Sequence, residues 1–174
     1  TAFIRDFENI QREVAANEAR IQGARRVENL FTETEDFNNV VWVTFTSGGG
    51  TVAISTDGKS ITCDAPIGGR AMVLMSYAVS DGESLILSLT QTINSGLVTR
   101  QNLQVLNTDV IRNTDGRIEL NGTKAPAGSD TIRFGVGATV AVIDACSITY
   151  TLPQLEKPVG TQTLASEYVS NGEL

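Results

Sequence analysis

The sequence predicts an all-β protein, an antiparallel two-sheet sandwich of the jelly-roll kind, preceded by an N-terminal arm. First, short runs rich in β-branched and aromatic residues recur along the chain after residue 40. Second, turns that contain Gly, Asn, Asp or Pro separate these runs. Third, no stretch between the runs has the spacing of a helix. About eight to ten short strands joined by Gly-rich turns fit two packed antiparallel sheets.

The predicted strands follow one another from residue 40 to residue 152. The first of them is β-branched and aromatic, so it is predicted to be buried. In residues 84–92, leucines at every second position alternate with Ser and Thr, but Ile86 interrupts the alternation and suggests burial on both faces. The predicted strands comprise residues 40–45, 51–55, 60–63, 70–79, 84–92, 97–105, 110–112, 117–120, 131–136 and 140–152.

Residues 1–24 form the predicted arm, and residues 25–174 form the predicted sandwich. The apolar residues of the arm have helical spacing, but Phe3, Arg5 and Phe7 alternate as in a strand. We favour an extended arm and keep the helix as the alternative. In either conformation the apolar side chains need a surface to pack on, and a neighbouring subunit is the best candidate. The residues predicted to bind that partner are Phe3, Phe7, Ile10 and Val14.

Composition limits the classes of partner. The chain has 174 residues and a net charge of −7, which argues against nucleic acid, because phosphates demand a basic surface. No apolar run approaches the ~20 residues of a membrane helix, and the first residues lack a signal-peptide pattern. We therefore expect a soluble protein with no membrane insertion.

Histidine and cysteine usage limits the chemistry. The chain has no histidine, which removes the commonest general base and the commonest zinc ligand. Cys63 and Cys146 are far apart in the sequence, and we favour two free buried thiols over a disulfide. Residues 135–138 lack the Lys-Ser/Thr ending of a phosphate loop, so they are predicted to form a bulge or turn.

Two motifs at opposite ends of the chain carry a family resemblance. Arg-Arg-Val-Glu-Asn-Leu at residues 25–30, Thr-Glu-Asp-Phe-Asn-Asn at residues 34–39 and then Trp42 resemble the opening of a carbohydrate-binding-module-like jelly-roll domain. Such domains are frequent in bacteriophage tail fibres and other virion surface proteins. Pro-Gln-Leu-Glu at residues 153–156 and Ser-Glu-Tyr-Val-Ser-Asn-Gly at residues 166–172 are similar to their closing motif. The stretch between the motifs matches only in its pattern of strands.

This resemblance implies a non-enzymatic structural component of a phage virion, such as a fibre, decoration or receptor-facing protein. It implies other virion proteins as partners and a homo-oligomer, most plausibly a trimer. The alternative is a glycan-binding module that recognises carbohydrate on the host surface. A glycan-degrading enzyme is a third and weaker hypothesis, because histidine is absent and no acid pair is recognisable.

Three aromatic residues are candidates for binding a sugar: Trp42, Tyr77 and Tyr150. Their rings could stack on the apolar face of a pyranose. Packing in the core is the competing role, and we favour it because all three lie within predicted strands. For Trp42 the neighbouring apolar residues also favour a dry strand.

Charged residues offer two further candidate sites. The resemblance implies that a structural calcium could lie near the first and last strands, held by oxygen ligands. We favour a solvated acidic turn and predict no cofactor; the acidic residues concerned are Glu33, Glu35, Asp36 and Asp144. The dense basic cluster of Arg20, Arg25 and Arg26 either clamps an acidic partner or pairs with acidic residues of its own domain. We favour internal pairing.

Overall fold

The computed structural model describes residues 2–5, 11–14, 30, 36–38, 41–137 and 140–158. It divides the chain into two units, one of them Asn29–Ala165 and the other Thr1–Glu28 together with Ser166–Leu174. Nowhere in the described ranges is there a helix long and apolar enough to cross a membrane. The domain boundary expected at residue 25 stays a prediction.

The N-terminal unit contains an antiparallel pair of strands, β1 (Ala2–Arg5) and β2 (Gln11–Val14). Over these residues the chain is extended, as the favoured alternative for the arm predicted. Phe3 lies on β1 and Val14 on β2, whereas Phe7 and Ile10 lie outside the described residues. The predicted contact of these side chains with a neighbouring subunit stays a prediction.

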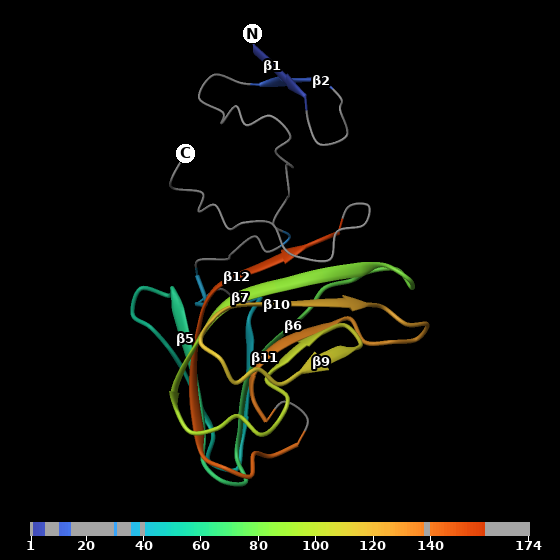
Figure 1. Ribbon diagram of the computed structural model, residues 1–174. Helices are drawn as coiled ribbons and strands as arrows, with labels where there is room; N and C mark the ends of the chain where they lie inside the picture. The colour runs from blue at the N-terminus through green and yellow to red at the C-terminus, as the bar shows by residue number, and fades with distance from the viewer. Residues whose placement is uncertain are drawn as a thin grey trace. The chain divides into compact units, whose positions relative to one another are not determined.

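The second unit is a sandwich of two five-stranded antiparallel sheets (Figure 1). The first, called here the β7 sheet, has the order β10-β7-β12-β5-β4. Its strands are β4 (Thr51–Ile54), β5 (Ser60–Ala65), β7 (Ser84–Ser95), β10 (Gly116–Thr123) and β12 (Cys146–Glu156). The second, called here the β6 sheet, has the order β3-β6-β11-β8-β9. Its strands are β3 (Val43–Ser47), β6 (Arg70–Ser76), β8 (Leu103–Val105), β9 (Thr108–Val110) and β11 (Thr131–Val136).

The connectivity confirms the predicted jelly roll. Within the β7 sheet the order is β5-β12-β7-β10, and within the β6 sheet it is β6-β11-β8-β9, so the last strand lies beside the first and the next-to-last beside the second. This interleaving of eight strands across two sheets is the double Greek key of a jelly roll. β3 and β4 extend one edge of each sheet.

Most predicted strands are present, with shifted ends. The predicted strand 97–105 is regular only as β8, and the predicted strand 140–152 begins at Cys146 and continues to Glu156. β12 continues past the predicted end, and an irregularity between Thr151 and Gln154 interrupts its pairing with β7 only locally. A bulge of this kind admits Pro153, which has no amide hydrogen to donate to a ladder.

The first predicted strand corrects the sequence analysis. β3 was predicted to be buried, but Val43 is 51% exposed and Phe45 is 43% exposed. The physical reason is position: β3 is an edge strand that pairs with β6 alone among the described strands. An apolar β-branched run has the same local pattern at an edge as in the middle of a sheet. Ile86, in contrast, is fully buried, as its broken alternation predicted.

The core lies between the two sheets and contains a chain of aromatic contacts. The ring of Trp42 is 5.4 Å from that of Phe37 and 5.8 Å from that of Phe134, and the ring of Phe134 is 5.0 Å from that of Tyr150. These centroid distances and tilted geometries are those of favourable aromatic pairs. The aromatic chain therefore joins the segment before β3 to the centres of β11 and β12.

Two buried amides hold the segment that follows β9. Asn102 donates to Gln91 through Nδ2 over 2.7 Å, and its Oδ1 accepts from the backbone nitrogen of Arg112 over 3.0 Å. Gln91 in turn donates to the carbonyl of Arg112 over 3.0 Å. Because buried polar groups are costly unless satisfied, this network fixes the path of the chain at the edge of the β6 sheet.

Candidate ligand-binding face

The three aromatic residues predicted as sugar contacts lie in or beside the core. Trp42 is 7% exposed and Tyr150 is fully buried, and burial raises the pKa of the Tyr150 hydroxyl well above its usual value. Tyr77 is partly buried against the core cluster. The buried rings of Trp42 and Tyr150 leave no open face for a sugar, and packing, the role favoured from the sequence, accounts for both.

A different set of side chains crosses the outer face of the β6 sheet in one row. Val43 on β3 is opposite Leu74 on β6, and Leu74 is opposite Arg133 on β11. Arg133 is opposite Gln104 on β8, and Gln104 is opposite Asp109 on β9. Side chains directly opposite one another in a sheet have Cβ atoms about 4.5–5.5 Å apart. These five residues, called here the polar row, therefore form a continuous line across the sheet.

Strand alternation decides that the polar row faces outward. The residues on either side of Arg133, Ile132 and Phe134, belong to the core cluster, and so do Leu103 and Val105 on either side of Gln104. Because successive side chains of a strand point to opposite faces, Arg133 and Gln104 point away from the core.

A second row runs beside the polar row and consists of Phe45, Met72 and Gly135. Met72 is not part of the core cluster, as expected for a side chain on the outer face, yet it is only 3% exposed. Gly135 has a φ of +141°, and a Cβ added there would lie 2.4 Å from the carbonyl oxygen of Ala71. Any larger residue would clash, so this position of the face carries no side chain.

The β3 side of the face is apolar and exposed. Val41 is 41% exposed, Val43 51% and Phe45 43%, and these alternate positions lie on or next to β3. An exposed apolar strip beside polar groups is typical of a binding surface. Phe45 provides the aromatic ring of this strip.

The other side of the face has polar atoms that the protein leaves unsatisfied. Gln104 is 8% exposed; its Nε2 donates to the carbonyl of Leu106 over 2.6 Å, but its Oε1 is buried with no hydrogen-bond partner. The Nε of Arg133 is also buried without a partner. Burial lowers the pKa of the Arg133 guanidinium, while the nearby charge of Asp109 raises it. Unsatisfied buried polar groups are rare in folded proteins. Three others occur in the described part of the chain, on Thr99, Arg100 and Tyr150, and those of Gln104 and Arg133 share this face, which makes them candidates for contact with a ligand.

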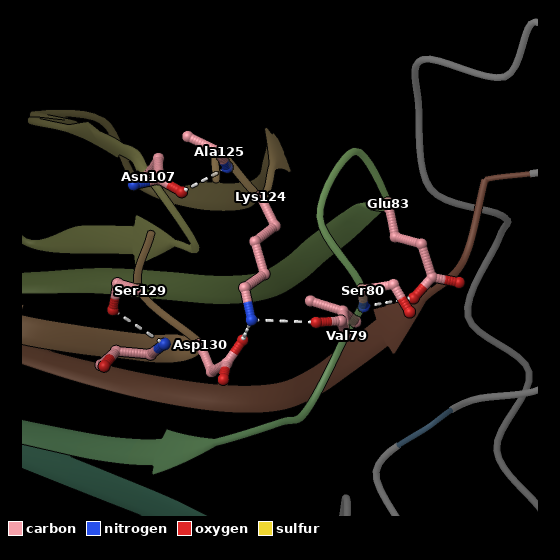
Figure 2. Close-up of polar contacts among 9 residues, drawn as sticks. Val79, Ser80, Glu83, Asn107, Lys124, Ala125, Ser129 and Asp130 are labelled. Atoms are coloured by element: carbon pink, nitrogen blue, oxygen red, sulfur yellow. Dashed lines mark hydrogen bonds and ion pairs between the residues drawn. The ribbon is translucent and has the colours of Figure 1, made fainter. Parts of the chain in front are cut away.

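Polar contacts at one end of the sandwich hold the start of β11, the strand that carries Arg133 (Figure 2). The Nζ of Lys124 lies 2.5 Å from Asp130 Oδ1 and 3.0 Å from the carbonyl oxygen of Val79. The carbonyl of Asp130 accepts from the backbone nitrogen of Tyr77 over 3.0 Å. Ser129 accepts from the backbone nitrogen of Thr131 over 3.0 Å. Lys124 therefore ties the loops before β7 and before β11 together.

Four acidic residues were considered as possible ligands of a calcium ion. In the described part of the chain they form no group that could hold a metal. Asp36 and Asp144 are both exposed, and Asp36 accepts a hydrogen bond from the backbone nitrogen of Asn38 over 2.9 Å. Glu33 and Glu35 lie outside the described residues, as do Arg20, Arg25 and Arg26. Within the ranges that the structure describes, no three acidic or cysteine side chains are grouped to hold a metal.

The prediction of free buried thiols is confirmed, whereas the bulge or turn predicted for residues 135–138 is present, among the described residues, only as a bend at Gly137. Cys63 and Cys146 are free and buried. Burial, with smaller contributions from Asp64 and Cys146, raises the pKa of Cys63, and burial is also the main cause that raises the pKa of Cys146. Gly135 lies within β11, and Gly137 lies in the bend that follows it with a φ of +70°.

Sequence reasoning missed Phe45, Arg133 and Gln104 as candidate site residues. A local signal exists for two of them: Arg133 lies between Ile132 and Phe134, and Gln104 between Leu103 and Val105. A long polar side chain flanked by core residues marks the solvent face of a strand. The sequence pattern does not contain the register that brings the two side chains together.

Comparisons with known proteins are limited to the fold. No protein-family model matches the chain, and no curated protein sequence matches it. The chain is similar to the enzymatically active domain of bacteriophage CBA120 tailspike protein 4, with 16% identity and a TM-score of 0.49 over 75% of this chain and 21% of that chain. The chain therefore spans about a fifth of the tailspike chain.

Two carbohydrate-binding domains are also similar. A CBM4 module has 11% identity and a TM-score of 0.47, with 74% of this chain and 93% of the module covered. The N-terminal cellulose-binding domain of Cellulomonas fimi β-1,4-glucanase C has 18% identity and a TM-score of 0.42, with 68% and 90% covered. At such values these likenesses carry no evidence on function. The chain has a jelly-roll fold, which its own strand order establishes.

Proposed function

We propose that this protein is a non-enzymatic glycan-binding module whose binding site is the outer face of the β6 sheet. The observation that supports it is the juxtaposition on one face of an exposed aromatic ring, Phe45, with the unsatisfied polar groups of Gln104 and Arg133. This function is the alternative that the sequence analysis kept beside a structural role in a virion.

The chemistry of a sugar fits this pairing. A pyranose presents an apolar C–H face and a rim of hydroxyl groups. The ring of Phe45 and the side chain of Val43 offer an apolar surface for the face. Arg133 offers donors, Asp109 offers acceptors, and the Oε1 of Gln104 is an acceptor left without a donor. A bound hydroxyl would relieve the cost of that buried, unsatisfied oxygen after a small side-chain movement.

The same face argues for binding without catalysis. Hydrolysis of a glycosidic bond commonly requires two carboxyl groups on opposite sides of the bond, one of them with a raised pKa. Asp109 is the single carboxylate among the described residues of the polar row and the row of Phe45, Met72 and Gly135.

A second candidate function is the structural role in a phage virion, with other virion proteins as partners, a homotrimer as the assembly and the virion as the location. One observation favours it. β3 pairs through one edge only among the described strands, and its side chains Val43 and Phe45 are exposed together with Val41. An apolar edge strand of this kind is a template for pairing with another chain. The two functions therefore make different use of the same strand.

Binding to an array of immobilised bacterial and plant polysaccharides tests the first function. We expect the protein to bind at least one glycan, and Phe45→Ala to weaken that binding by about tenfold or more, as loss of a stacked ring would. Ile67→Ala is the matched control, since Ile67 is 72% exposed in the connection between β5 and β6. Absence of binding to every glycan would contradict the proposal, and so would equal binding by Phe45→Ala.

Light scattering coupled to size-exclusion chromatography separates the two functions. If β3 serves assembly, Phe45→Ala should convert an oligomer into smaller species without a change in glycan binding. If β3 serves glycan binding, the mass in solution should be the same for the protein and the variant.

A further inference from the structure

We propose that the face selects glycans that contain carboxylated sugars, namely hexuronic acids, and that Arg133 binds the carboxylate. This inference rests on the proposed function and adds the chemical class of the ligand.

The charges on the outer face of the β6 sheet differ from those of the whole chain. The chain has a net charge of −7, yet the described strands of the β6 sheet place two arginines and one acid on its outer face. Arg133 lies in the polar row, and Arg70 lies on the same face of β6 as Met72 and Leu74, because the three are at alternate positions of one strand. Asp109 is the acid. A locally basic surface on an acidic protein indicates an anionic ligand.

The two arginines lie apart on this face. Arg70 precedes Met72 by two residues, and Arg133 is opposite Leu74, which follows Met72 by two residues. The two arginines therefore flank the pair of Met72 and Gly135, about 13 Å apart along the strand direction at about 3.3 Å per residue. Gly135 has no side chain to project between the arginines, and the pair itself is buried. A linear polymer with a carboxylate on successive residues matches two separated cations better than a single small anion does.

Arg133 also has a hydrogen-bonding group that the protein does not satisfy. The Nε of Arg133 is buried without a hydrogen-bond partner, and neither of the ion pairs Lys124–Asp130 and Lys157–Glu83 involves Arg133. Its guanidinium is half-buried, so its charge is less screened than one in open water. A planar carboxylate accepts two parallel hydrogen bonds from a guanidinium, which gives strength and orientation. A neutral sugar would leave Asp109 as the one opposite charge near the guanidinium among the described residues of the polar row.

The other sheet provides a contrast. On the outer face of the β7 sheet, Thr62 and Thr149 share a hydrogen bond of 2.8 Å between their hydroxyl oxygens. Asn94 donates to Thr149 over 2.9 Å and to Ser147 over 3.1 Å. These polar groups satisfy one another. Gln104 and Arg133 on the β6 sheet keep buried atoms that no described residue satisfies.

Titration calorimetry of the full chain with three polysaccharides that contain uronic acids, called here polyuronates, tests the inference. The probes are polygalacturonate, alginate and hyaluronate, each paired with its carboxyl-reduced form, which keeps the backbone of the polymer and loses the charge. We expect at least one polyuronate to bind about tenfold or more tightly than its reduced form, as a charge-assisted hydrogen bond would give. That preference should fall as sodium chloride is raised.

Variants with opposite expected signs sharpen the test. Arg133→Gln keeps hydrogen-bonding capacity and removes the charge. It should therefore lower the affinity for the polyuronate to the affinity for its reduced form. Asp109→Asn removes the competing acid and should raise the ratio of the affinity for the polyuronate to that for its reduced form by about threefold. Lys59→Gln is the control, because it removes one positive charge from the exposed hairpin between β4 and β5 and should change neither affinity. Melting curves of all variants identify any that fail to fold, and Asp109→Asn keeps the test valid if Arg133→Gln is one of them.

The outcomes separate this inference from the proposed function. If neutral and charged forms bind equally, and Phe45→Ala loses both, the glycan-binding function stands and the choice of carboxylated sugars is wrong. The same holds if only neutral glycans bind. If no polysaccharide binds, both are wrong. The inference would also be overturned if Asp109→Asn lowered the ratio of the two affinities, or if Lys59→Gln lowered it as much as Arg133→Gln does.

Discussion

At the scale of single residues, Trp42 and Phe45 show how three positions separate a core residue from a surface residue. Trp42 is 7% exposed and contacts the rings of Phe37 and Phe134, whereas Phe45 is 43% exposed. The local sequence, a run of valines and aromatics, does not distinguish them. Their burial depends on the pairing of β3 with β6, and that pairing joins residues distant in the sequence.

Substitution of these two residues should therefore have unequal effects on stability. Trp42→Ala removes a buried ring and leaves a cavity, which should lower the free energy of unfolding by about 3–5 kcal/mol. Phe45→Ala at the exposed edge should change it by about 0.5 kcal/mol or less. Chemical denaturation followed by circular dichroism measures both values. An equal loss for the two variants would contradict the placement of Phe45 on the surface.

The buried cysteines make a second prediction at this scale. In the folded protein neither Cys63 nor Cys146 should react with a thiol reagent, and both should react after unfolding, because they are free and buried. Colorimetric thiol titration with and without denaturant measures this. Rapid reaction of either thiol in the native protein would show that the strands β5 and β12 open locally.

The same thiols give the stability a dependence on pH. Burial raises the pKa of both thiols in the folded state, whereas unfolded thiols ionise near pH ~8.5. Above that pH the folded state binds more protons than the unfolded state, so stability is full below it and falls as the pH rises. Replacing both cysteines with alanine should flatten the alkaline side of the profile. An unchanged slope would show that other groups cause it.

At the scale of elements, the loop contacts before β11 hold the strand that carries Arg133. The side chain of Lys124 is 14% exposed and that of Asp130 is 38% exposed, so their ion pair is partly shielded from water. The ion pair between Lys157 and Glu83 is more open, with side chains 48% and 40% exposed. Two lysines of the same chain therefore allow a matched comparison.

Lys124→Met should cost about 1–3 kcal/mol, because the carbonyl of Val79 and the carboxylate of Asp130 lose a shared donor. Lys157→Met should cost less than about 1 kcal/mol, as for most exposed ion pairs. Denaturant midpoints of the two variants give the comparison. If Lys157→Met proved the more destabilising, the loop cluster of Figure 2 would not be the element that fixes the start of β11.

At the scale of the whole molecule, the sequence predicted the fold class better than the site. Turn residues and alternating strands are local signals, and they were sufficient to predict a jelly roll whose eight strands interleave across two sheets. The candidate site depends on the register of five strands, four of which pair with strands distant in the sequence. For this reason the aromatic candidates from the sequence were residues such as Trp42 and Tyr150, for which core packing was favoured and which the structure places in the core, and not Phe45. Arg133 was not among the candidates either.

The predicted arm can be tested on the same scale. Deletion of residues 1–24 should leave a sandwich that melts cooperatively, because the aromatic core and both five-stranded sheets lie outside this range. If the arm binds a neighbouring subunit, the deleted protein should also have a smaller mass by light scattering. Loss of cooperative melting would show instead that residues 1–24 are part of the domain.

The central claim is that a glycan binds the outer face of the β6 sheet, and amide chemical shifts in two-dimensional NMR test it most directly. A bound polysaccharide should shift amides of β3, β6, β11 and β8 near Phe45, Met72, Arg133 and Gln104, and leave those of β4 and β5 in place. Phe45→Ala should abolish the shifts while the rest of the spectrum is retained. Shifts gathered instead around Thr62 and Thr149 on the β7 sheet would contradict the claim.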